Sequence, residues 1–436
     1  MADFQTCAER IRTRTATIAV IGQGYVGLTV ACAAAIAGMR VAAIDVDTER
    51  IDALAEGRNI VPGVPNDLFT TAYATGRMHF GADPAATAAA DVILICVPTP
   101  VIEHRPDLSY IEKAAQAVAP FVREGALVVL ESTTYPGTTE QVVRPLLEAS
   151  GRIAGSDFLL AYSPERVDPG NTKYGLRETP RVVGGLTHTS TQVAALFYGQ
   201  LVDDVYPLSS CRAAELAKLL ENTFRMVNIA LVNELAMLCA AQDIDVWEVI
   251  GAAATKPFGF MPFYPGPGVG GHCIPLDPTY LAWQSRRDTG RRFRLVEMAQ
   301  DINAQMPTYV TGRIVDALND REISVRRARI LVVGVTYKPD VGDIRESAAI
   351  EVLARLAHKG AEVTYYDPFV ARVTEHGLNL ESVPLDPGRV ASADCVALLT
   401  PHTRIDLHML TTHAQFVFDA RNAIGRRDYP SIVALL

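Results

Sequence analysis

The stretch Thr17-Ile-Ala-Val-Ile-Gly-Gln-Gly-Tyr-Val-Gly27 decides the fold of the first half of this 436-residue chain. Its first five residues are apolar and predict a short buried strand. The glycines that follow, Gly22, Gly24 and Gly27, permit a tight turn and let a phosphate approach the backbone. We therefore expect the strand to run into a helix N-terminus, where unpaired N–H groups and the helix dipole favour an anion.

The residues after this turn complete a dinucleotide-binding pattern. Residues 28–37 are rich in alanine and predict a helix, Gly38 ends it, and residues 39–44 predict a second strand. Asp45 comes 18 residues after Gly27, where a carboxylate accepts hydrogen bonds from an adenosine ribose. Strand, turn, helix, strand and acid in this order predict an NAD site. Its expected contacts are Gly22, Gly24, Tyr25, Val26, Gly27, Asp45, Arg50 and Thr99.

Three further apolar stretches predict the rest of a parallel sheet. They are residues 90–100, 126–130 and 158–162. Polar residues follow each strand at the carboxyl edge, where ligands bind in such sheets. Thr99 and Thr133 can reach a nicotinamide or a sugar there, or can cap the next helix. Glu165, in the stretch 163–170, either acts in acid–base chemistry or is a solvated loop acid.

The middle of the chain is predicted to be helical. Leucines and valines at helical spacing predict one long helix over 213–242, followed by helices over 245–254 and around 295–303. Lys218 and Asn222 are four residues apart and share a face of the long helix. This face is either functional or part of a surface salt-bridge pattern with neighbouring glutamates.

A loop rich in glycine and proline lies between these helices: Pro265-Gly-Pro-Gly-Val-Gly-Gly-His-Cys-Ile-Pro-Leu-Asp277. Its glycines are expected to leave the backbone open to a ligand, and its prolines to fix the loop's shape. Cys273 follows at once, and a thiol beside such a loop suggests a covalent step on a bound small molecule. The alternative is a turn followed by a buried, inert thiol.

A second α/β pattern begins near residue 329. Strands are expected over 329–334, 362–367, 393–402 and 415–421, with a helix ending at Lys359. This half lacks the glycine turn and offers Lys338, Arg345 and Arg421, which suit a different phosphate ligand. The prediction is an α/β fold of two Rossmann-like doubly wound domains joined by a central helical domain with a long helix. The expected domains are 1–208, 209–308 and 309–436.

Composition narrows the class of protein. With 49% hydrophobic and 20% charged residues, the chain is globular, and its length predicts two or three domains. The formal net charge of -9 argues against nucleic-acid or membrane partners. No apolar run reaches the roughly 18 residues that span a bilayer, and the N-terminus lacks a signal core. The seven cysteines form no Cys-x-x-Cys pair, so we expect a cytoplasmic protein without a metal site.

Eight motifs in one order resemble the UDP-glucose/GDP-mannose dehydrogenase family over essentially the whole chain. They are Gly22-x-Gly-Tyr-Val-Gly27, Pro98-Thr-Pro100, Glu131-Ser-Thr133, Ser163-Pro-Glu-Arg166, Lys218-x-x-x-Asn222, Gly270-Gly-His-Cys-Ile-Pro-Leu-Asp277, Lys338-Pro-Asp340 and Gly342-Asp-Ile-Arg-Glu-Ser347. The resemblance implies an NAD-dependent, four-electron oxidation of a sugar C6 alcohol to a carboxylate, on a sugar nucleotide.

The resemblance also implies roles for individual residues. Cys273 matches the nucleophile of a thiohemiacetal and thioester, and Thr133 and Glu165 match residues that position water and act in thioester hydrolysis. Lys218, Asn222 and Asp277 match residues that stabilise an oxyanion and organise water. Arg345 matches a cofactor contact. Matches to the substrate site are Lys218, Asn222, Phe263, Tyr264, Gly268, Gly270, Lys338 and Arg421.

The sugar stays open between UDP-glucose and a UDP-N-acetylhexosamine. Several UDP-glucose enzymes carry an arginine before the cysteine where this chain has Pro257, and the run from Lys256 to Cys273 is similar to the UDP-N-acetylglucosamine branch. dTDP-glucose and GDP-mannose are alternatives, and so is a single-step 3-hydroxyacid-type dehydrogenase. The crowded apolar positions of residues 224–238 predict a homodimer.

Overall fold

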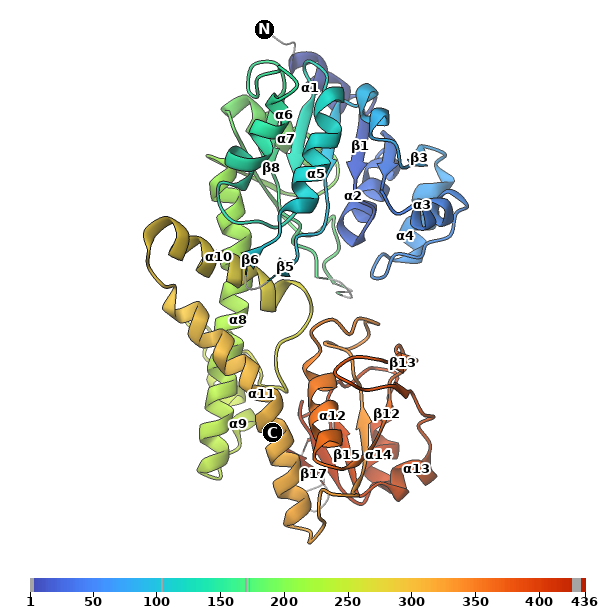
Figure 1. Cartoon of the computed structure of the whole chain (residues 1–436), viewed down its shortest axis with the longest axis vertical. Coiled ribbons are helices and arrows are strands. Elements are labelled where there is room, and N and C mark those ends of the chain that lie inside the picture. The colour runs from blue at the N-terminus through green and yellow to red at the C-terminus, as the bar shows by residue number, and fades with distance from the viewer. Residues whose placement is uncertain (1–3, 103–104, 169–170, 172, 426–432) are drawn as a thin grey trace. The chain divides into compact units, whose positions relative to one another are not determined.

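The computed structural model describes residues 4–102, 105–168, 171, 173–425 and 433–436. The last two residues of the predicted stretch 163–170 therefore lie outside the described residues. The chain divides into two compact units, Met1–Glu221 and Asn222–Leu436 (Figure 1). Each unit contains one large sheet.

The first unit is built on an eight-stranded sheet of order β10-β9-β8-β7-β4-β1-β2-β3. Its neighbours are parallel except β8 and β9, which are antiparallel. The strands are β1 Thr17–Ile21, β2 Arg40–Ile44, β3 Met78–Gly81, β4 Val92–Ile95, β7 Leu127–Leu130, β8 Leu159–Tyr162, β9 Arg181–Gly185 and β10 Val205–Leu208. The predicted strands near 17–21, 39–44, 126–130 and 158–162 are confirmed. The stretch 90–100 forms a strand only in its apolar first half.

Helices cover this sheet, and their apolar sides complete its core. They are α1 Phe4–Arg12, α2 Tyr25–Ile36, α3 Thr48–Ala55, α4 Asn66–Ala74, α5 Ser109–Val118, α6 Arg144–Glu148 and α7 His188–Tyr198. Short elements complete the unit: η1 Pro84–Ala89, η2 Ala119–Phe121, η3 Thr139–Val143 and the hairpin β5 Val101–Ile102 with β6 Arg105–Pro106. Helix α2 begins three residues earlier than predicted, because Gly24 is its N-cap. The helix therefore starts inside the glycine turn.

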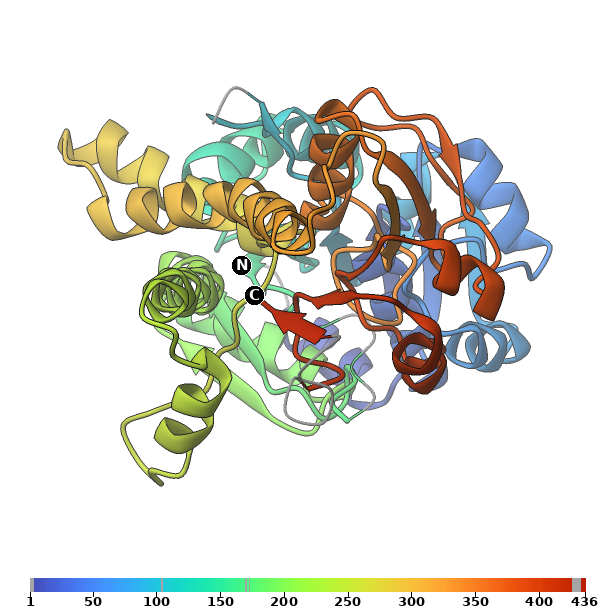
Figure 2. The ribbon, with the colours of Figure 1, turned by 90° about the horizontal axis from the view of Figure 1, so that it is seen from below.

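The helical region confirms the long helix. Helix α8 covers Cys211–Ala241 and is followed by α9 Val246–Ala254, α10 Cys273–Thr289 and α11 Arg294–Asn319. Among the described residues, α8 is the one helix long and apolar enough to cross a membrane by length and composition. Its buried residues pack instead into small clusters with α9 and α11. Figure 2 shows α10 and α11 as a pair of neighbouring helices.

The second unit's sheet has five parallel strands in the order β12-β11-β15-β16-β17. The strands are β11 Arg329–Val333, β12 Glu362–Tyr366, β15 Cys395–Leu398, β16 Val417–Asp419 and β17 Val433–Leu435. The helices are α12 Ala348–His358, α13 Pro387–Ser392 and α14 Leu407–His413, with a hairpin of β13 Arg372–Val373 and β14 Leu380–Glu381. Residues of α11, α12 and the sheet share one core. The predicted α/β fold with two Rossmann-like sheets and a central long helix is confirmed.

Candidate active site

The glycine turn leaves room for a phosphate at one position. Gly22 has φ +93°, and a Cβ there would come within 2.5 Å of the carbonyl oxygen of Cys96. A Cβ on Gly27 would overlap the carbonyl oxygen of Gly22. Gly24 differs, because nothing lies within 4 Å of its Cβ direction and no side chain caps α2 there. The N-terminus of α2 is thus open, which fits the pyrophosphate of a dinucleotide.

Asp45 ends β2 and supports the same turn. Its Oδ2 accepts the N–H of Gln23 at 2.6 Å and Nη1 of Arg50 at 2.9 Å, and its Oδ1 accepts the N–H of Asp47 at 3.0 Å. Arg50 also pairs with the Asp47 side chain at 3.0 Å and stays one-third exposed. The acid predicted to bind a ribose is therefore held in place by the backbone, with a solvent-accessible partner. Tyr25 and Val26 open α2 and are half-buried.

Two predicted edge residues lie on loops that are tied together. Ser132 follows β7, and its Oγ accepts the N–H of Val97 at 3.0 Å and donates to the Val97 carbonyl at 2.7 Å. Thr99 and Thr133 are the neighbours of this contact, and both are half-buried. The structure brings the stretches after β4 and β7 to one edge of the sheet, as predicted.

Glu165 lies in a buried cluster rather than in solvent. Its Oε1 accepts the N–H groups of Arg166 and Val167, both at 2.7 Å, and its Oε2 accepts Nη1 of Arg181 at 2.5 Å. Arg181 is 2% exposed, and its Nη2 also donates to Glu131 at 2.6 Å. Sequence reasoning missed Arg181, because its position depends on β9 running antiparallel to β8. An arginine that begins an apolar strand was the available signal.

The pKa values of the two carboxylates that contact Arg181, those of Glu131 and Glu165, shift in opposite directions. Burial raises the pKa of Glu131, although Arg181 and the hydroxyl of Tyr198, which donates at 2.5 Å, act against it. Burial would also raise the pKa of Glu165, but the charge of Arg181 and the N–H donors outweigh it and lower that pKa. At neutral pH the cluster therefore holds Glu165 as an anion, while Glu131 is the more readily protonated acid.

In the second unit, one hydrogen bond joins two predicted catalytic residues. Nδ2 of Asn222, on α8, donates to Oδ2 of Asp277, on α10, at 2.5 Å, and both residues are buried. Lys218 precedes Asn222 by one turn of α8, and Cys273 precedes Asp277 by one turn of α10. The spacing of four residues in both motifs thus places each partner on the side of its helix that carries this bond.

Cys273 is the first residue of α10 and the one exposed cysteine of the seven. A helix N-terminus stabilises negative charge, which favours a reactive thiolate. Arg345 lies near it: its pKa is raised by its hydrogen bond with Asp343, and the Cys273 charge is a further cause. Burial and the charge of Arg345 lower the pKa of His272, so the thiol lies beside a neutral imidazole and a cation. The reading of Cys273 as a buried thiol is wrong.

The glycines before Cys273 also allow close packing against the second unit's sheet and loops. A Cβ on Gly266 would overlap the Arg421 guanidinium, and one on Gly270 would come within 2.5 Å of the Glu346 carbonyl oxygen. A Cβ on Gly268 would lie 2.8 Å from the Ala348 side chain. The loop is also anchored from its backbone, since Asn233 accepts the Gly266 N–H at 3.0 Å.

The predicted aromatic contacts also pack against helices. Phe263 meets Phe224 of α8 edge to face at 5.7 Å between ring centroids, and Tyr264 stacks on Trp247 of α9 at 5.9 Å. Tyr264 remains 52% exposed. The pair holds the segment before the glycine loop against the helical region while leaving one ring accessible.

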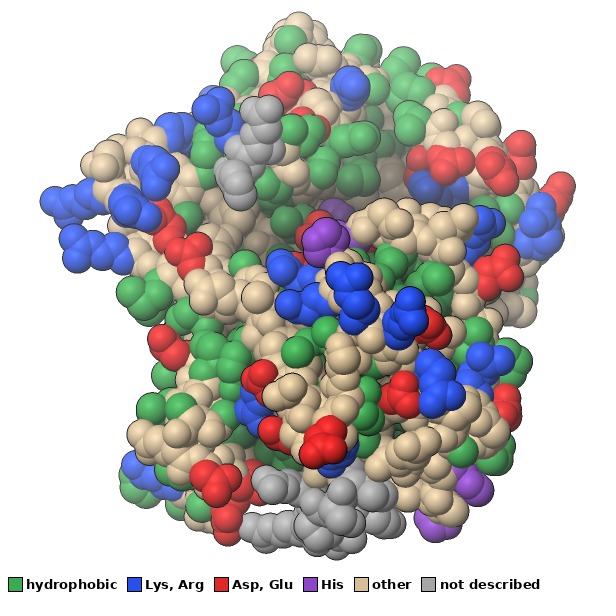
Figure 3. All heavy atoms as spheres, turned by 60° about the horizontal axis from the view of Figure 1, so that its bottom comes forward, with side chains coloured by type: hydrophobic (Ala, Val, Ile, Leu, Met, Phe, Trp, Pro, Cys, Tyr) green, Lys and Arg blue, Asp and Glu red, His purple; other side chains and the backbone are tan. Residues whose placement is uncertain are grey.

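Arg421 is a desolvated cation suited to an anion. It follows β16, its Nε donates to the Leu399 carbonyl at 3.4 Å, and burial lowers its pKa to about 10. In the part of the chain that the structure describes, no carboxylate pairs with its guanidinium. Although the net charge is -9, Lys and Arg side chains gather in the middle of the face in Figure 3.

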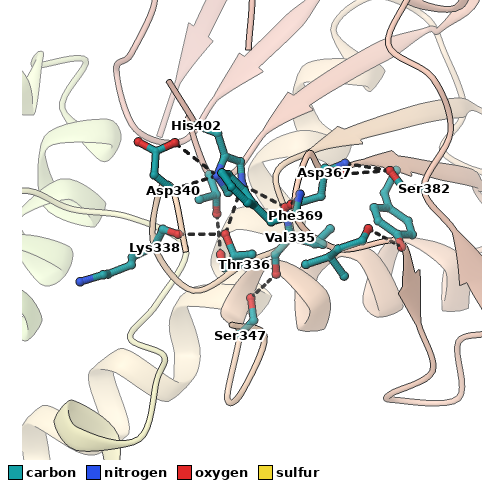
Figure 4. Close-up of polar contacts among 12 residues, drawn as sticks. Val335, Thr336, Lys338, Asp340, Ser347, Asp367, Phe369, Ser382 and His402 are labelled. Carbon is teal, nitrogen blue, oxygen red and sulfur yellow. Dashed lines mark hydrogen bonds and ion pairs between the residues drawn. The ribbon is translucent and has the colours of Figure 1, made fainter. Parts of the chain in front are cut away.

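Lys338 stands on a loop held by a buried histidine. His402 accepts the Asp340 N–H at Nδ1 (2.9 Å), and its Nε2 lies 3.0 Å from Asp367. Thr336 donates to the Lys338 carbonyl at 2.9 Å. Figure 4 shows the Lys338 side chain extending away from this cluster. The network therefore fixes the backbone of Lys338 and leaves its ammonium group to reach outward. Among the described residues no group of three His, Cys, Asp or Glu could hold a metal ion.

Family models match the chain in three consecutive blocks. Residues 16–202 match the NAD binding domain of the UDP-glucose/GDP-mannose dehydrogenase family. Residues 212–305 match its central domain, and residues 331–426 match its UDP binding domain. Together the blocks cover most of the chain in the order of the motifs.

Individual relatives match over nearly the whole length. A UDP-N-acetyl-D-mannosamine dehydrogenase of Escherichia coli K12 is 34% identical over 422 residues, covering 93% of this chain and 98% of the relative. The structure of a UDP-D-ManNAc dehydrogenase from Pyrococcus horikoshii aligns with a TM-score of 0.86 at 32% identity, covering 96% and 98%. A UDP-glucose dehydrogenase structure from Pyrobaculum islandicum gives 0.83 at 27%, covering 96% and 97%.

Proposed function

Because the chain belongs to the UDP-glucose/GDP-mannose dehydrogenase family, we propose that it oxidises C6 of UDP-N-acetyl-D-mannosamine to the uronate. The coarser statement is established: it is an NAD-dependent oxidoreductase that acts on the CH–OH group of a UDP-sugar. The choice of sugar is supported by relatives of that name, 34–36% identical over 88–93% of the chain. This choice narrows the sequence-based expectation of UDP-glucose or a UDP-N-acetylhexosamine.

The first unit holds the cofactor. Gly22, Gly24 and Gly27 place the open N-terminus of α2 against the pyrophosphate, and Asp45 accepts from the ribose. Tyr25, Val26, Arg50 and Thr99 line the same site. NAD, when bound, accepts the hydride that leaves the sugar carbon, once for each of the two oxidations. Asp45 favours NAD over NADP, because it would repel a 2′-phosphate.

Cys273 carries the covalent chemistry, and its exposure at the start of α10 is the observation on which the proposal rests. Loss of hydride and a proton from the C6 alcohol gives an aldehyde. The Cys273 thiolate adds to the aldehyde carbon, and the adduct can then lose a second hydride to become a thioester. Lys218 and Asn222 stabilise the oxyanion, with Asn222 held by Asp277.

Hydrolysis of the thioester regenerates the thiol. Water attacks the acyl carbon and one of its protons passes to Glu165; the C–S bond then breaks to release the Cys273 thiolate and the carboxylic acid, which loses its remaining proton to solvent. Thr133 positions the water by hydrogen bonding.

The second unit holds the UDP part of the substrate. Burial lowers the pKa of Arg421, no carboxylate among the described residues pairs with its guanidinium, and Lys338 extends from a fixed loop. Both cations therefore suit phosphate or uridine oxygens. Phe263 and Tyr264 offer ring surface, and Gly268 and Gly270 offer backbone groups. Arg345 is assigned to contact with the cofactor. We assign residues 1–208 to the cofactor, 209–308 to catalysis and dimerisation, and 309–436 to the sugar nucleotide.

The exposed apolar stripe of α8 supports a homodimer. Phe224, Leu231 and Leu238 are 45%, 61% and 53% exposed and recur every seven residues. This is the period at which one helix presents a continuous apolar stripe to another. A monomeric mass in solution at micromolar concentration would refute the dimer.

The decisive experiment incubates the protein with NAD and each of UDP-N-acetylmannosamine, UDP-N-acetylglucosamine, UDP-glucose and dTDP-glucose. We expect two NADH per sugar and a uronate from the first substrate. One NADH per substrate would favour the rival single-step 3-hydroxyacid-type dehydrogenase. Cys273→Ala should lose acid formation, and Cys273→Ser should stall at an ester or aldehyde level in mass spectra of a single turnover. Normal uronate formation by Cys273→Ala would refute the mechanism.

A further inference from the structure

Strand β9 delivers a cation to the catalytic edge of the first sheet. Because β9 runs antiparallel to β8 with Gly184 opposite Tyr162, the first residue of β9 lies beyond the end of β8, level with Glu165. The polar residues after β7 and β8 are at this same edge. Arg181 therefore stands between Glu131, which follows β7, and Glu165, which follows β8. An antiparallel addition to a parallel sheet is what makes this placement possible.

Each nitrogen of the Arg181 guanidinium donates a hydrogen bond, and its flat face contacts an aromatic ring. Nη1 and Nη2 reach the two carboxylates, Nε donates to Ser163 Oγ at 3.0 Å, and its flat face lies 4.7 Å from the Tyr198 ring centroid. Ser163 in turn donates to the Val182 carbonyl at 2.9 Å. A guanidinium with fixed direction at each nitrogen fixes the carboxylates that it contacts. Lysine has one nitrogen and cannot reproduce this bridge.

Glu165 is held by three donors on two oxygens. The Arg166 and Val167 N–H groups both approach Oε1, so Oε2 is the oxygen on the Arg181 side. An Oε2 with one donor keeps a lone pair for a further hydrogen bond, such as one from water. Arg166 is itself held by Glu221 of α8 at 2.7 Å. The carboxylate thus has one orientation, set from both of its sides.

We propose that Arg181 is a positioning residue that keeps Glu165 ionised and aims its Oε2 at the water of the hydrolytic step. This inference rests on the proposed function, because it needs a thioester to hydrolyse. Arg181 touches neither substrate nor cofactor in this role. When Glu165 takes a proton from water, Arg181 keeps its second hydrogen bond, to Glu131, and so stays in position.

The proposal has a consequence for the pH profile. The charged and titratable groups around Glu165 come from five elements: Arg181 of β9, Glu131 after β7, Cys96 after β4, Tyr198 of α7, and Arg166 with its partner Glu221 of α8. Of these, Arg181 is the one cation bonded to the carboxylate side chain. Without it Glu165 gains a proton at higher pH, so the acid limb of the kcat profile should move upward.

The test compares Arg181→Gln and Arg181→Lys with wild type, using NAD and UDP-N-acetylmannosamine. Single-turnover mass spectra follow the Cys273 adduct, and steady-state kcat is measured from pH 4 to 9. Arg177→Gln is the matched control, since Arg177 is 76% exposed and pairs with Asp203 at the surface. Arg181→Lys keeps the charge in case Arg181→Gln does not fold.

We expect Arg181→Gln to form acid about 10- to 100-fold more slowly and to accumulate the thioester. Its acid limb should move up by about one to two pH units. Arg181→Lys should accumulate less thioester and shift the limb less, and Arg177→Gln should match wild type. A folded Arg181 variant, Lys or Gln, with an unmoved acid limb and no adduct would overturn the inference. Wild type without two NADH per sugar would instead overturn the proposed function.

Discussion

The two nucleotide-type sheets use one aspartate in the same way and then diverge. Asp45 and Asp367 both follow the second strand, and each accepts an N–H from the turn after the first strand, at 2.6 Å from Gln23 and 2.8 Å from Val335. The side chain that pairs with each aspartate differs between the two units. Asp45 meets Arg50, which is one-third exposed, whereas Asp367 meets His402, whose side chain is 0% exposed.

The helix N-termini diverge as well. Gly24, before α2, faces open space, whereas Gly268 packs against Ala348, the first residue of α12. The chain itself thus covers in the second unit what is open in the first. In both units this aspartate holds the turn after the first strand. It can serve a ribose only where its last partner and the neighbouring helix leave space.

The largest expected effect is the loss of Asp367. Asp367→Ala leaves the N–H groups of Val335 and Phe369, and the His402 ring, without their acceptor in a buried site. The free energy of unfolding should therefore fall by about 3–5 kcal/mol. Asp45→Ala should lower the free energy of unfolding by about 1–2 kcal/mol less than Asp367→Ala does, because water can hydrate the partly exposed Arg50. Urea titration of both variants measures the difference, and equal losses would show that the two acids are equivalent.

The glycines of the first turn should separate folding from binding. Gly27→Ala would overlap the Gly22 carbonyl and should destabilise the protein by at least about 2 kcal/mol. The Cβ of Gly24→Ala would contact no protein atom, so the free energy of unfolding should change by less than about 1 kcal/mol. The same methyl group would fill the phosphate site and should weaken NAD binding roughly tenfold. Thermal melts and NAD titrations check this. Unchanged NAD affinity in Gly24→Ala would place the pyrophosphate elsewhere.

Asp45→Ala should also narrow cofactor preference. Removing the carboxylate removes the repulsion of a 2′-phosphate and an acceptor for the 2′-hydroxyl, together about 1–3 kcal/mol or roughly 5- to 150-fold in relative kcat/KM. The measurement is kcat/KM for NAD and NADP in wild type and variant. Equal efficiency with both cofactors in wild type would contradict the assignment of Asp45.

The smallest effect is on acid stability. Burial would raise the pKa of Asp367, but the His402 hydrogen bond and the N–H donors outweigh it and lower that pKa. Its contribution to stability is therefore present above the unfolded value of about 4 and is lost as pH falls through the lower folded value. Asp367→Asn should flatten the fall in melting temperature below about pH 4. A wild-type slope in this variant would exclude Asp367 as its source.

Periodicity and the glycine turn predicted most of the fold, and the exceptions have local causes. The predicted glycine loop extends to Asp277 and includes Pro275, whereas helix α10 already begins at Cys273 and also contains Pro278. In the first turn of a helix, however, Pro275 loses no hydrogen bond, and one proline further on is tolerated in a packed helix. Helix α11 likewise continues through Pro307 to Asn319. Strand β17 was not predicted, since three residues carry too little pattern.

The site could be predicted only where motif and local structure coincide. The shared helix face of Lys218 and Asn222 follows from their spacing, and Asp45 follows from the strand–turn–helix order. Cys273 and Asp277 were predicted from the glycine loop and the family motif, without the helix that carries them. Arg181 could not be predicted, because no spacing in the sequence reveals that β9 is antiparallel. The packing role of Gly266 and Gly270 was hidden for the same reason, since their neighbours are distant in sequence. Whether the predicted residues act as assigned stays a prediction.

The packed glycine loop limits how this enzyme's substrate range can be changed. Residues 265–271 pack among Asn233, Tyr337, Ala348 and Arg421, so we expect substitutions there to destabilise the fold before they change specificity. The preceding segment has Phe258 and Met261 at 71% and 61% exposure and tolerates many side chains. A library for altered sugar choice should therefore hold the glycines constant and vary residues 256–262, where diversity costs little stability.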